Sequence, residues 1–322
     1  MNILYISSGY ARVYQFFDSC ILTELKKFFG VRVEFFTQLQ DFSGFQLICN
    51  QFKPDIVFTL LGDLLPIDTL NWIKDQRFRS VLWLTEDPYY TDRSIKILPF
   101  FDIVFSIDSG AVDYYKSLQY KNVYHLPLGT DPGVFTPGDK KGKVHDICLV
   151  GYPYPDRIRL LLLLLKETPY QIQVVGNMWR KQFFAKATDT NVSLLNRWVH
   201  PSAAAHFYRS AKIVLNTHRP YDEKTNQNSA GIINRSINNR TFDIASCKSF
   251  QLIQYMDDLP LHFQEHMEIV SFQTNEELIG KLDYYLSNEE ERQSIAANGR
   301  KKVLLQHTFH HRLKRIINGK LN

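Results

Sequence analysis

The feature of this sequence that most constrains its fold is a repeated alternation of short apolar runs with longer amphipathic segments. The runs are rich in β-branched and aromatic residues, and the whole pattern restarts in the second half of the chain. Such alternation is typical of parallel sheets whose two faces are covered by helices. The strands that we expect are residues 3–7, 31–37, 55–60, 80–85, 102–107 and 122–126, then 145–150, 171–175, 212–216, 249–254 and 268–272.

The two halves are separated by a segment rich in proline and glycine, HLPLGTDPGVFTPGDKKGK, which predicts a loop or linker. A chain of 322 residues with 44% hydrophobic content is long enough for two cores. We therefore place a boundary near Gly129 and expect an α/β fold with two Rossmann-like domains whose sheets face a cleft. The clearest helices that we expect are residues 13–29, 66–75, 156–167, 202–210, 275–287, 289–306 and 309–318.

The composition limits the class of protein. A net charge of +5 fits a phosphate-bearing ligand or an anionic surface, but without a run of basic residues it does not predict a nucleic-acid partner. The N-terminus does not resemble a secretory signal, and the longest apolar run, residues 160–165, is too short to span a bilayer. We expect a cytoplasmic protein without a transmembrane segment. Four scattered cysteines in apolar stretches predict buried, reduced thiols: Cys20, Cys49, Cys148 and Cys247.

Candidate ligand-binding residues follow the predicted strands, because open parallel sheets bind ligands beyond the carboxyl ends of their strands. Ser8 and Gly9 follow the first strand, where a glycine lets the backbone approach a ligand such as a phosphate. The segment is not a GxGxxG motif, so an ordinary strand-to-helix turn is the alternative. The residues that follow the strands of the two predicted sheets are small, acidic and basic. This is the composition that a site for a sugar linked to a diphosphate requires.

Two carboxylates, Glu86 and Asp87, stand at the tip of a predicted central strand and are followed by a proline. Carboxylates are costly there unless they are partnered or exposed in a cleft. Asp87, and after it Glu86, is therefore our candidate for a base that accepts a proton from an acceptor hydroxyl. The alternatives are a helix N-cap and a structural ion pair.

In the second half, Gly151 and Tyr152 follow the first strand and lead into a helix that Asp156 could cap. Arg157 lies in the first turn of that helix, where a cation opposes the helix dipole unless an anion binds. We interpret Arg157 as a candidate phosphate clamp, with a solvated surface arginine as the alternative. Asn216 and His218 follow another strand and are further candidates for donor binding.

The stretch from residue 234 to residue 243 begins a helix, for which Ser236 or Asn238 is the expected cap. Arg240 and Asp243 are spaced three apart and share a face, so Arg240 could bind a phosphate and Asp243 the ribose hydroxyls. The alternative is an ion pair between the two. The polar segment before them, residues 221–234, predicts a mobile loop that could close over the donor.

We expect neither a metal site nor a cofactor. His310 and His311, with His307 nearby, form the densest histidine group, but basic residues surround them and no cysteine or carboxylate cluster completes a site. No DxD motif follows a strand, and no GxSxG motif or P-loop occurs.

Several segments carry a family resemblance. Residues 122–137 resemble the segment that opens the second domain of many GT-B glycosyltransferases. Residues 239–247, NRTFDIASC, resemble the N-x-R-x-F-E-x-x-A-C-G stretch in the family of the spore maturation protein CgeB and its relative YkvP. Further stretches that are similar to this family are residues 105–115, 146–157, 212–216 and 292–312.

The resemblance implies a GT-B fold and a glycosyltransferase-like activity on a spore-surface glycan or protein, on the mother-cell side or retained on the spore surface. It implies that the position of Asp243, a glutamate in related transferases, binds the ribose, and that Arg157 or Arg240, together with Asn239, belongs to the donor site. Here aspartate is one methylene shorter, and Lys248 stands where the family has glycine. The resemblance also implies domains at residues 1–128 and 129–307, with residues 308–322 packing back on the first.

Three functions are compatible with these observations. The first is metal-independent transfer of a sugar from a nucleotide-diphosphate donor to an acceptor hydroxyl, in which a base is needed only if the reaction inverts. The second is epimerisation of a nucleotide sugar, for which Glu86, Asp87 or His218 could exchange protons. The third is a non-catalytic spore-surface protein that retains the fold. The sequence identifies neither the donor, nor the acceptor, nor the oligomeric state.

Overall fold

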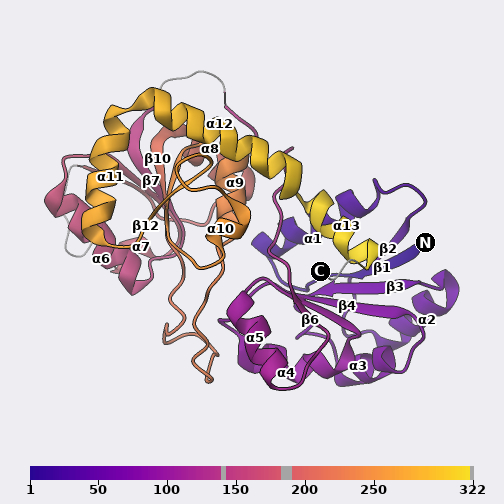
Figure 1. Cartoon of the computed structure of the whole chain (residues 1–322). Coiled ribbons are helices and arrows are strands. Elements are labelled where there is room, and N and C mark those ends of the chain that lie inside the picture. The colour runs from indigo at the N-terminus through magenta and orange to yellow at the C-terminus, as the bar shows by residue number, and fades with distance from the viewer. Residues whose placement is uncertain (139–142, 183–190, 320–322) are drawn as a thin grey trace. The chain divides into compact units, whose positions relative to one another are not determined.

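The computed structural model describes residues 1–138, 143–182 and 191–319, which form two compact α/β units (Figure 1). Each unit is built on a six-stranded parallel sheet. Unit 1 comprises Met1–Gly129, Tyr221–Ser236 and Phe309–Asn322, and unit 2 comprises Thr130–Pro220 and Ile237–Thr308.

The sheet of unit 1 has the order β2-β1-β3-β4-β5-β6, and all neighbouring strands are parallel. All six strands expected in the first half are present, with ends that differ by at most two residues. The order reverses direction between β1 and β3, as in doubly wound folds. The strands are β1 Asn2–Ile6, β2 Arg32–Phe36, β3 Ile56–Leu60, β4 Arg79–Leu84, β5 Ile103–Ser106 and β6 Val123–His125.

Helices cover both faces of this sheet (Figure 1). Four of them share a core with one face: α2 Phe42–Phe52, α3 Ile67–Lys74, α4 Thr91–Ile97 and α5 Ser109–Ser117. On the other side α1, Val13–Leu25, packs with the C-terminal α13, Phe309–Asn318. The rings of Phe17 and Phe309 lie 6.4 Å apart, and His310 Nδ1 lies 2.8 Å from Glu24 Oε1. The helix α13 therefore packs against α1 of unit 1.

The sequence analysis does not predict α2. Its first turn contains Ser43 and Gly44, which favour loops more than helices. The helix forms because the side chain of Asp41 caps it, accepting a hydrogen bond from Gly44 N at 2.8 Å, and because Phe45 and Cys49 are buried against the sheet.

The sheet of unit 2 has the order β12-β11-β10-β7-β8-β9, again with parallel neighbours. Counted from its own first strand this is the 3-2-1-4-5-6 order of dinucleotide-binding folds. The sequence analysis misses β9, whose burial is only partial and whose flanks are polar. The strands are β7 His145–Val150, β8 Ile172–Val175, β9 Val192–Leu195, β10 Ala211–Asn216, β11 Gln251–Gln254 and β12 Val270–Phe272.

The leucine-rich helix α6, Pro155–Glu167, packs on this sheet together with α11, Asn275–Ser287, and α12, Glu289–Gln306. A second cluster gathers around the buried Phe242 of α9, Arg240–Ser246. The remaining helices of unit 2 are α7 Trp179–Gln182, α8 Pro201–Ser210 and α10 Leu259–His262. The two expected caps are wrong, because α6 begins one residue before Asp156 and α9 begins after Asn239 without a side-chain cap.

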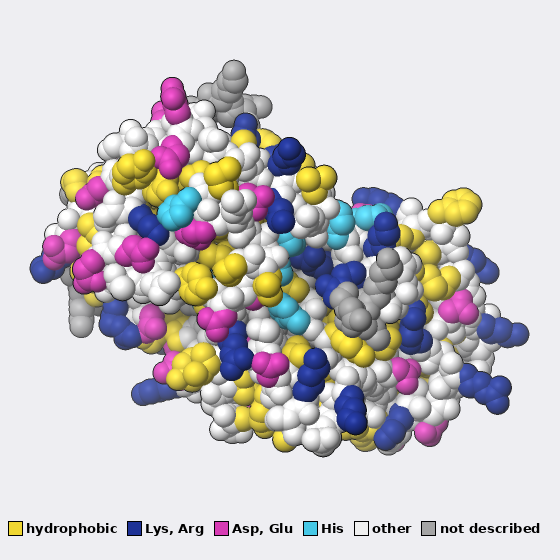
Figure 2. Space-filling model, viewed as in Figure 1, with side chains coloured by type: hydrophobic (Ala, Val, Ile, Leu, Met, Phe, Trp, Pro, Cys, Tyr) yellow, Lys and Arg dark blue, Asp and Glu magenta, His cyan; other side chains and the backbone are white. Residues whose placement is uncertain are grey.

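All four cysteines are free and buried, which confirms the expectation of reduced thiols. Basic and acidic side chains are mixed on the visible face of the molecule (Figure 2).

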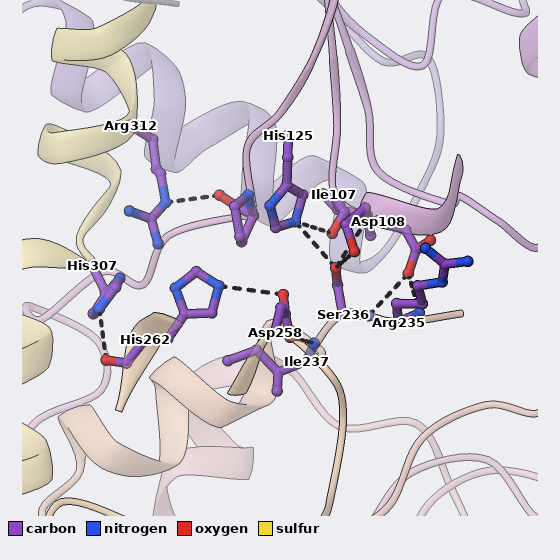
Figure 3. A network of polar contacts seen from close by, with 12 residues as sticks. Ile107, Asp108, His125, Arg235, Ser236, Ile237, Asp258, His262, His307 and Arg312 are labelled. Atoms are coloured by element: carbon purple, nitrogen blue, oxygen red, sulfur yellow. Dashed lines mark hydrogen bonds and ion pairs between the residues drawn. The ribbon is translucent and has the colours of Figure 1, made fainter. Parts of the chain in front are cut away.

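Residues 221–236, which include the predicted polar loop 221–234, belong to unit 1, whereas the expected domain at residues 129–307 placed them in the second half. They form a loop, as expected, and carboxylates of unit 1 accept hydrogen bonds from their backbone. Asp92 accepts from Ser229 N at 3.1 Å. Asp108 accepts from Arg235 N at 2.8 Å and from Ser236 N at 3.0 Å (Figure 3). We call residues 221–236 the arm.

Candidate functional site

The best-defined polar site lies at the carboxyl ends of β7 and β10 in unit 2. These strands are neighbours, yet they lead to opposite sides of the strand order, so the segments that follow them diverge at a topological switch point. Gly151 and Tyr152 follow β7, while Asn216 ends β10 and Thr217 and His218 come next. Four of these five residues are predicted donor-binding residues, and the topology places them at one sheet edge.

Arg157, in the first turn of α6, connects these two segments. It is 3% exposed. Its Nη1 donates to Tyr152 O at 2.6 Å, while Nε and Nη2 donate to Thr217 Oγ1 at 2.8 Å and Thr217 O at 2.9 Å. The guanidinium lies over the ring of Tyr154, 5.4 Å from its centroid. Arg157 is therefore no solvated surface arginine; it joins the loops that follow the two strands.

Arg240, the first residue of α9, reaches the same place from another direction. Its Nη1 donates to Val150 O at the end of β7, and its Nη2 donates to Thr217 O at 3.0 Å. The ion pair with Asp243 considered in the sequence analysis does not occur in the described structure as a direct contact; Arg240 acts on that carboxyl only at longer range. Two guanidiniums thus converge on this switch point and bring positive charge to it.

Gly151 makes this convergence possible. Its backbone φ angle is +150°, a value that residues with a side chain rarely adopt. A Cβ atom built on this glycine would lie 2.5 Å from Nη1 of both Arg157 and Arg240. Any larger residue must therefore displace both guanidiniums. The glycine is needed because two cationic side chains pack against its Cα.

His218 lies beside these arginines and is 7% exposed. Neither ring nitrogen forms a hydrogen bond. Burial, followed by the charges of Arg240 and Arg157, lowers the pKa of the imidazole to about 3. His218 is therefore neutral at physiological pH.

Asn216 connects the strand end to the start of α9. It is 2% exposed; its Nδ2 donates to Thr241 Oγ1 at 3.1 Å, and its Oδ1 accepts from Asn238 Nδ2 at 3.0 Å. These bonds fix where Arg240 begins the helix. By contrast, the side chain of Tyr152 is 44% exposed.

Asp243, the expected ribose ligand, points into the unit. It is 6% exposed, and its oxygens accept from Thr130 Oγ1 at 2.6 Å and from Asn239 Nδ2 at 3.4 Å. Burial raises the pKa of this carboxyl to about 8, against the lowering effects of Thr130 and Arg240. Its ribose contact stays a prediction.

The two candidate bases of unit 1, Glu86 and Asp87, lie in different surroundings. Asp87 is 2% exposed, and its oxygens accept from Ser94 Oγ at 2.9 Å, Ser106 Oγ at 2.7 Å and Tyr115 OH at 3.0 Å. Burial raises its pKa to about 6. Glu86 points to the α1 side, is only half-buried and accepts a hydrogen bond from the hydroxyl of Tyr14.

Of the two possibilities that the sequence analysis gave for Asp87, partnered or exposed in a cleft, the structure shows the first. Three hydroxyls hold it in the interior of unit 1, because this is how a buried carboxylate is satisfied.

Ser8 and Gly9, the candidates that follow the first strand, differ in exposure and in hydrogen bonds. Ser8 is 2% exposed, and its N and Oγ donate to the carboxylate of Asp18 on α1, with Oγ at 2.7 Å. Gly9 is exposed, has φ +76, and donates its N–H to Ser7 Oγ at 3.1 Å. Ser8 thus anchors the turn to α1, and Gly9 alone presents backbone at the surface.

Among the residues that follow the predicted strands, sequence reasoning did not single out Thr217, whose carbonyl accepts from both arginines. Nor did it single out Tyr10 and Asp63, which join the ends of β1 and β3 through a 2.7 Å hydrogen bond. Tyr10 and Asp63 lie at the switch point between β1 and β3, and only the order of the strands identifies them as residues of that point.

Within residues 1–138, 143–182 and 191–319, no group of three or more His, Cys, Asp or Glu side chains is arranged to hold a metal ion. In that same part of the chain, no helix has the length and apolar character needed to cross a membrane.

Comparison with known proteins agrees with this architecture. Sucrose-phosphate synthase from Thermosynechococcus elongatus superposes with a TM-score of 0.71 at 12% identity, covering 99% of both chains. HepE of Anabaena, in complex with UDP and glucose, superposes with a TM-score of 0.67 at 11% identity, again covering 99% of both chains. The expected GT-B fold, an α/β fold with two parallel sheets, is confirmed.

Residues 157–318 match a family described as "Glycosyl transferase-like". The spore protein CgeB of Bacillus subtilis (strain 168) is 34% identical over 311 residues, which is 96% of this chain and 95% of that protein. This chain therefore belongs to the family of the spore protein CgeB and carries a glycosyl transferase-like domain.

Proposed function

We propose that this protein transfers a sugar from a nucleotide-diphosphate donor to an acceptor hydroxyl in the formation of spore outer-layer glycan, and that the donor binds unit 2. The observation that carries the proposal is the convergence of Arg157 and Arg240 on Gly151 at the switch point between β7 and β10. Switch points are where doubly wound sheets bind their ligands, and two guanidiniums there favour a dianionic group.

The chemistry follows from charge. When the glycosidic bond to the diphosphate breaks, negative charge develops on the leaving phosphate. Arg157 and Arg240 are held in place before reaction by carbonyl oxygens of the loops after β7 and β10, so stabilising this charge needs little reorganisation. We propose that they stabilise the leaving group without a metal ion.

If the reaction inverts, a base must accept the proton of the acceptor hydroxyl. Of the two sequence candidates we now favour Glu86, because its side chain is partly exposed, whereas Asp87 is buried and enclosed by three hydroxyls. A retaining reaction needs no such base.

The test begins with a thermal-shift screen against UDP-, GDP-, dTDP- and CMP-linked sugars. We expect at least one diphosphate-linked sugar to raise the melting temperature. Arg240→Ala should weaken its binding about 10- to 100-fold, the equivalent of one charged hydrogen bond of about 1.5–3 kcal/mol.

The control is Arg159→Ala. Arg159 is also in the first turn of α6, but its side chain is 71% exposed and pairs with Asp156. It should leave donor affinity unchanged. Glu86→Gln should slow turnover and spare donor binding.

Three outcomes separate the alternatives. Release of the nucleoside diphosphate only when an acceptor is present supports transfer. Conversion of the sugar without any acceptor would indicate an epimerase. A screen in which no nucleotide sugar raises the melting temperature, with Arg240→Ala equal to wild type, would indicate a non-catalytic protein.

A further inference from the structure

The site in unit 2 contains a buried polar side chain without a hydrogen-bond partner. His218 is 7% exposed, and both Nδ1 and Nε2 lack a hydrogen bond. Close by, the side-chain oxygen Oδ1 of Asn238 is also buried and without a partner. Buried polar groups are rarely left unsatisfied, and a cluster of them indicates a ligand that completes the site.

The electrostatic surroundings of His218 are defined by four neighbours. Arg240 of α9 and Arg157 of α6 disfavour a proton on the imidazole, whereas Asp258 and the side chain of Gln254 favour one. Gln254 Oε1 is engaged by the backbone N–H of His218 at 3.2 Å. Burial and the two guanidiniums dominate, so the ring is neutral before a ligand binds.

We propose that His218 is a direct ligand of the anionic donor and that the site binds the donor's diphosphate together with a proton. This rests on the proposed function and specifies its donor site further.

A neutral imidazole offers one N–H donor and one lone pair, whereas phosphate oxygens are acceptors only. A diphosphate beside the ring therefore leaves one nitrogen without a partner until a proton is added. The same diphosphate supplies negative charges that offset Arg157 and Arg240, which removes their opposition to a proton on the ring and adds an attraction for it. The proton comes from solvent, and the imidazolium then donates from both nitrogens.

The proposal predicts that donor binding is linked to proton uptake. The probe is UDP-glucose, or the GDP- or dTDP-linked sugar that gives a larger thermal shift, because a diphosphate diester has no titrating group of its own near neutral pH. Calorimetric titrations in two buffers of different ionisation enthalpy give the number of protons bound. Wild type should take up as much as about one proton per site at about pH 6, and fewer at about pH 8.

Two variants make the test specific. His218→Gln keeps a donor and an acceptor but cannot bind the proton, so its proton uptake should fall to none and its affinity should lose its pH dependence. His206→Gln is the control, because His206 is exposed on α8 of the same unit. It should keep the wild-type proton uptake.

The outcomes are distinguishable. If wild type binds the nucleotide sugar without proton uptake, or if His218→Gln takes up as many protons as wild type, the inference is wrong and the proposed function stands. If no nucleotide sugar binds wild type, the proposed function fails and the inference fails with it. Should His218→Gln not fold, wild type alone decides, through NMR of labelled imidazoles with and without UDP-glucose.

Discussion

Gly151→Ala is the sharpest perturbation of the donor site, because it adds one methyl group where two guanidiniums meet. The new Cβ would lie 2.5 Å from Nη1 of Arg157 and of Arg240, whereas ordinary contacts begin at 3.4 Å. Each nitrogen must therefore move by 3.4 − 2.5 = 0.9 Å. For Arg157 that displacement takes the 2.6 Å bond to Tyr152 O to the limit of hydrogen bonding.

The cost has two parts. Overpacking costs about 1–3 kcal/mol. A non-glycine residue at φ +150 adds about 1–3 kcal/mol of backbone strain. We therefore expect the free energy of unfolding to fall by about 2–6 kcal/mol, and donor affinity to fall at least about tenfold, since each 1.4 kcal/mol of lost interaction is a factor of ten.

Urea denaturation measures the first quantity, and calorimetry at low temperature on the folded variant measures the second. The control is Gly280→Ala in α11, where a Cβ meets nothing within 4 Å. That variant should be more stable by about 0.5–1 kcal/mol and should bind donor normally. Wild-type stability and wild-type donor affinity in Gly151→Ala would refute the account of this glycine.

Two further predictions concern carboxylates. The pKa of Asp243 is raised to about 8, above its unfolded value, so the native state holds the extra proton; its contribution to stability is full below about pH 4 and is lost as the pH rises to about 8. Wild type should lose up to about 1.4 kcal/mol per pH unit in that window relative to Asp243→Asn, and parallel stability curves from pH 5 to pH 8 would contradict this. Asp108→Asn removes the charged acceptor of two backbone N–H groups of the arm, residues 221–236, and should speed limited proteolysis there at least about tenfold. Asp113→Asn, which breaks an exposed ion pair with Arg235, should leave the proteolysis rate within about twofold.

The candidate site was only partly predictable from the sequence. A cation in the first turn of a helix identified Arg157, and a strand end followed by a polar residue identified Asn216 and His218. The surroundings of Asp87 could not be predicted, because the three hydroxyls that bind it come from residues 94, 106 and 115, which are separated in the sequence. Nor could the role of Thr217, whose hydroxyl and carbonyl oxygens accept from arginines that lie far away in the sequence.

The arm was also only partly predictable from the sequence. Glycine and asparagine in residues 221–236 predicted a loop, and a loop is what forms. Which unit it packs with depends on Asp92 and Asp108, more than a hundred residues earlier in the chain. Local composition cannot specify such a contact.

The sequence by itself determined the class of fold, because the spacing of apolar residues dictates which segments are strands and helices and which faces they bury. It also determined that the chain has two such sheets. Only the tertiary structure decided the order of the strands, and with it the switch point between β7 and β10. The physical reason is that strand order depends on packing between segments far apart in the chain, whereas periodicity is local. The convergence of Arg157 and Arg240 on Gly151 is a consequence of that order.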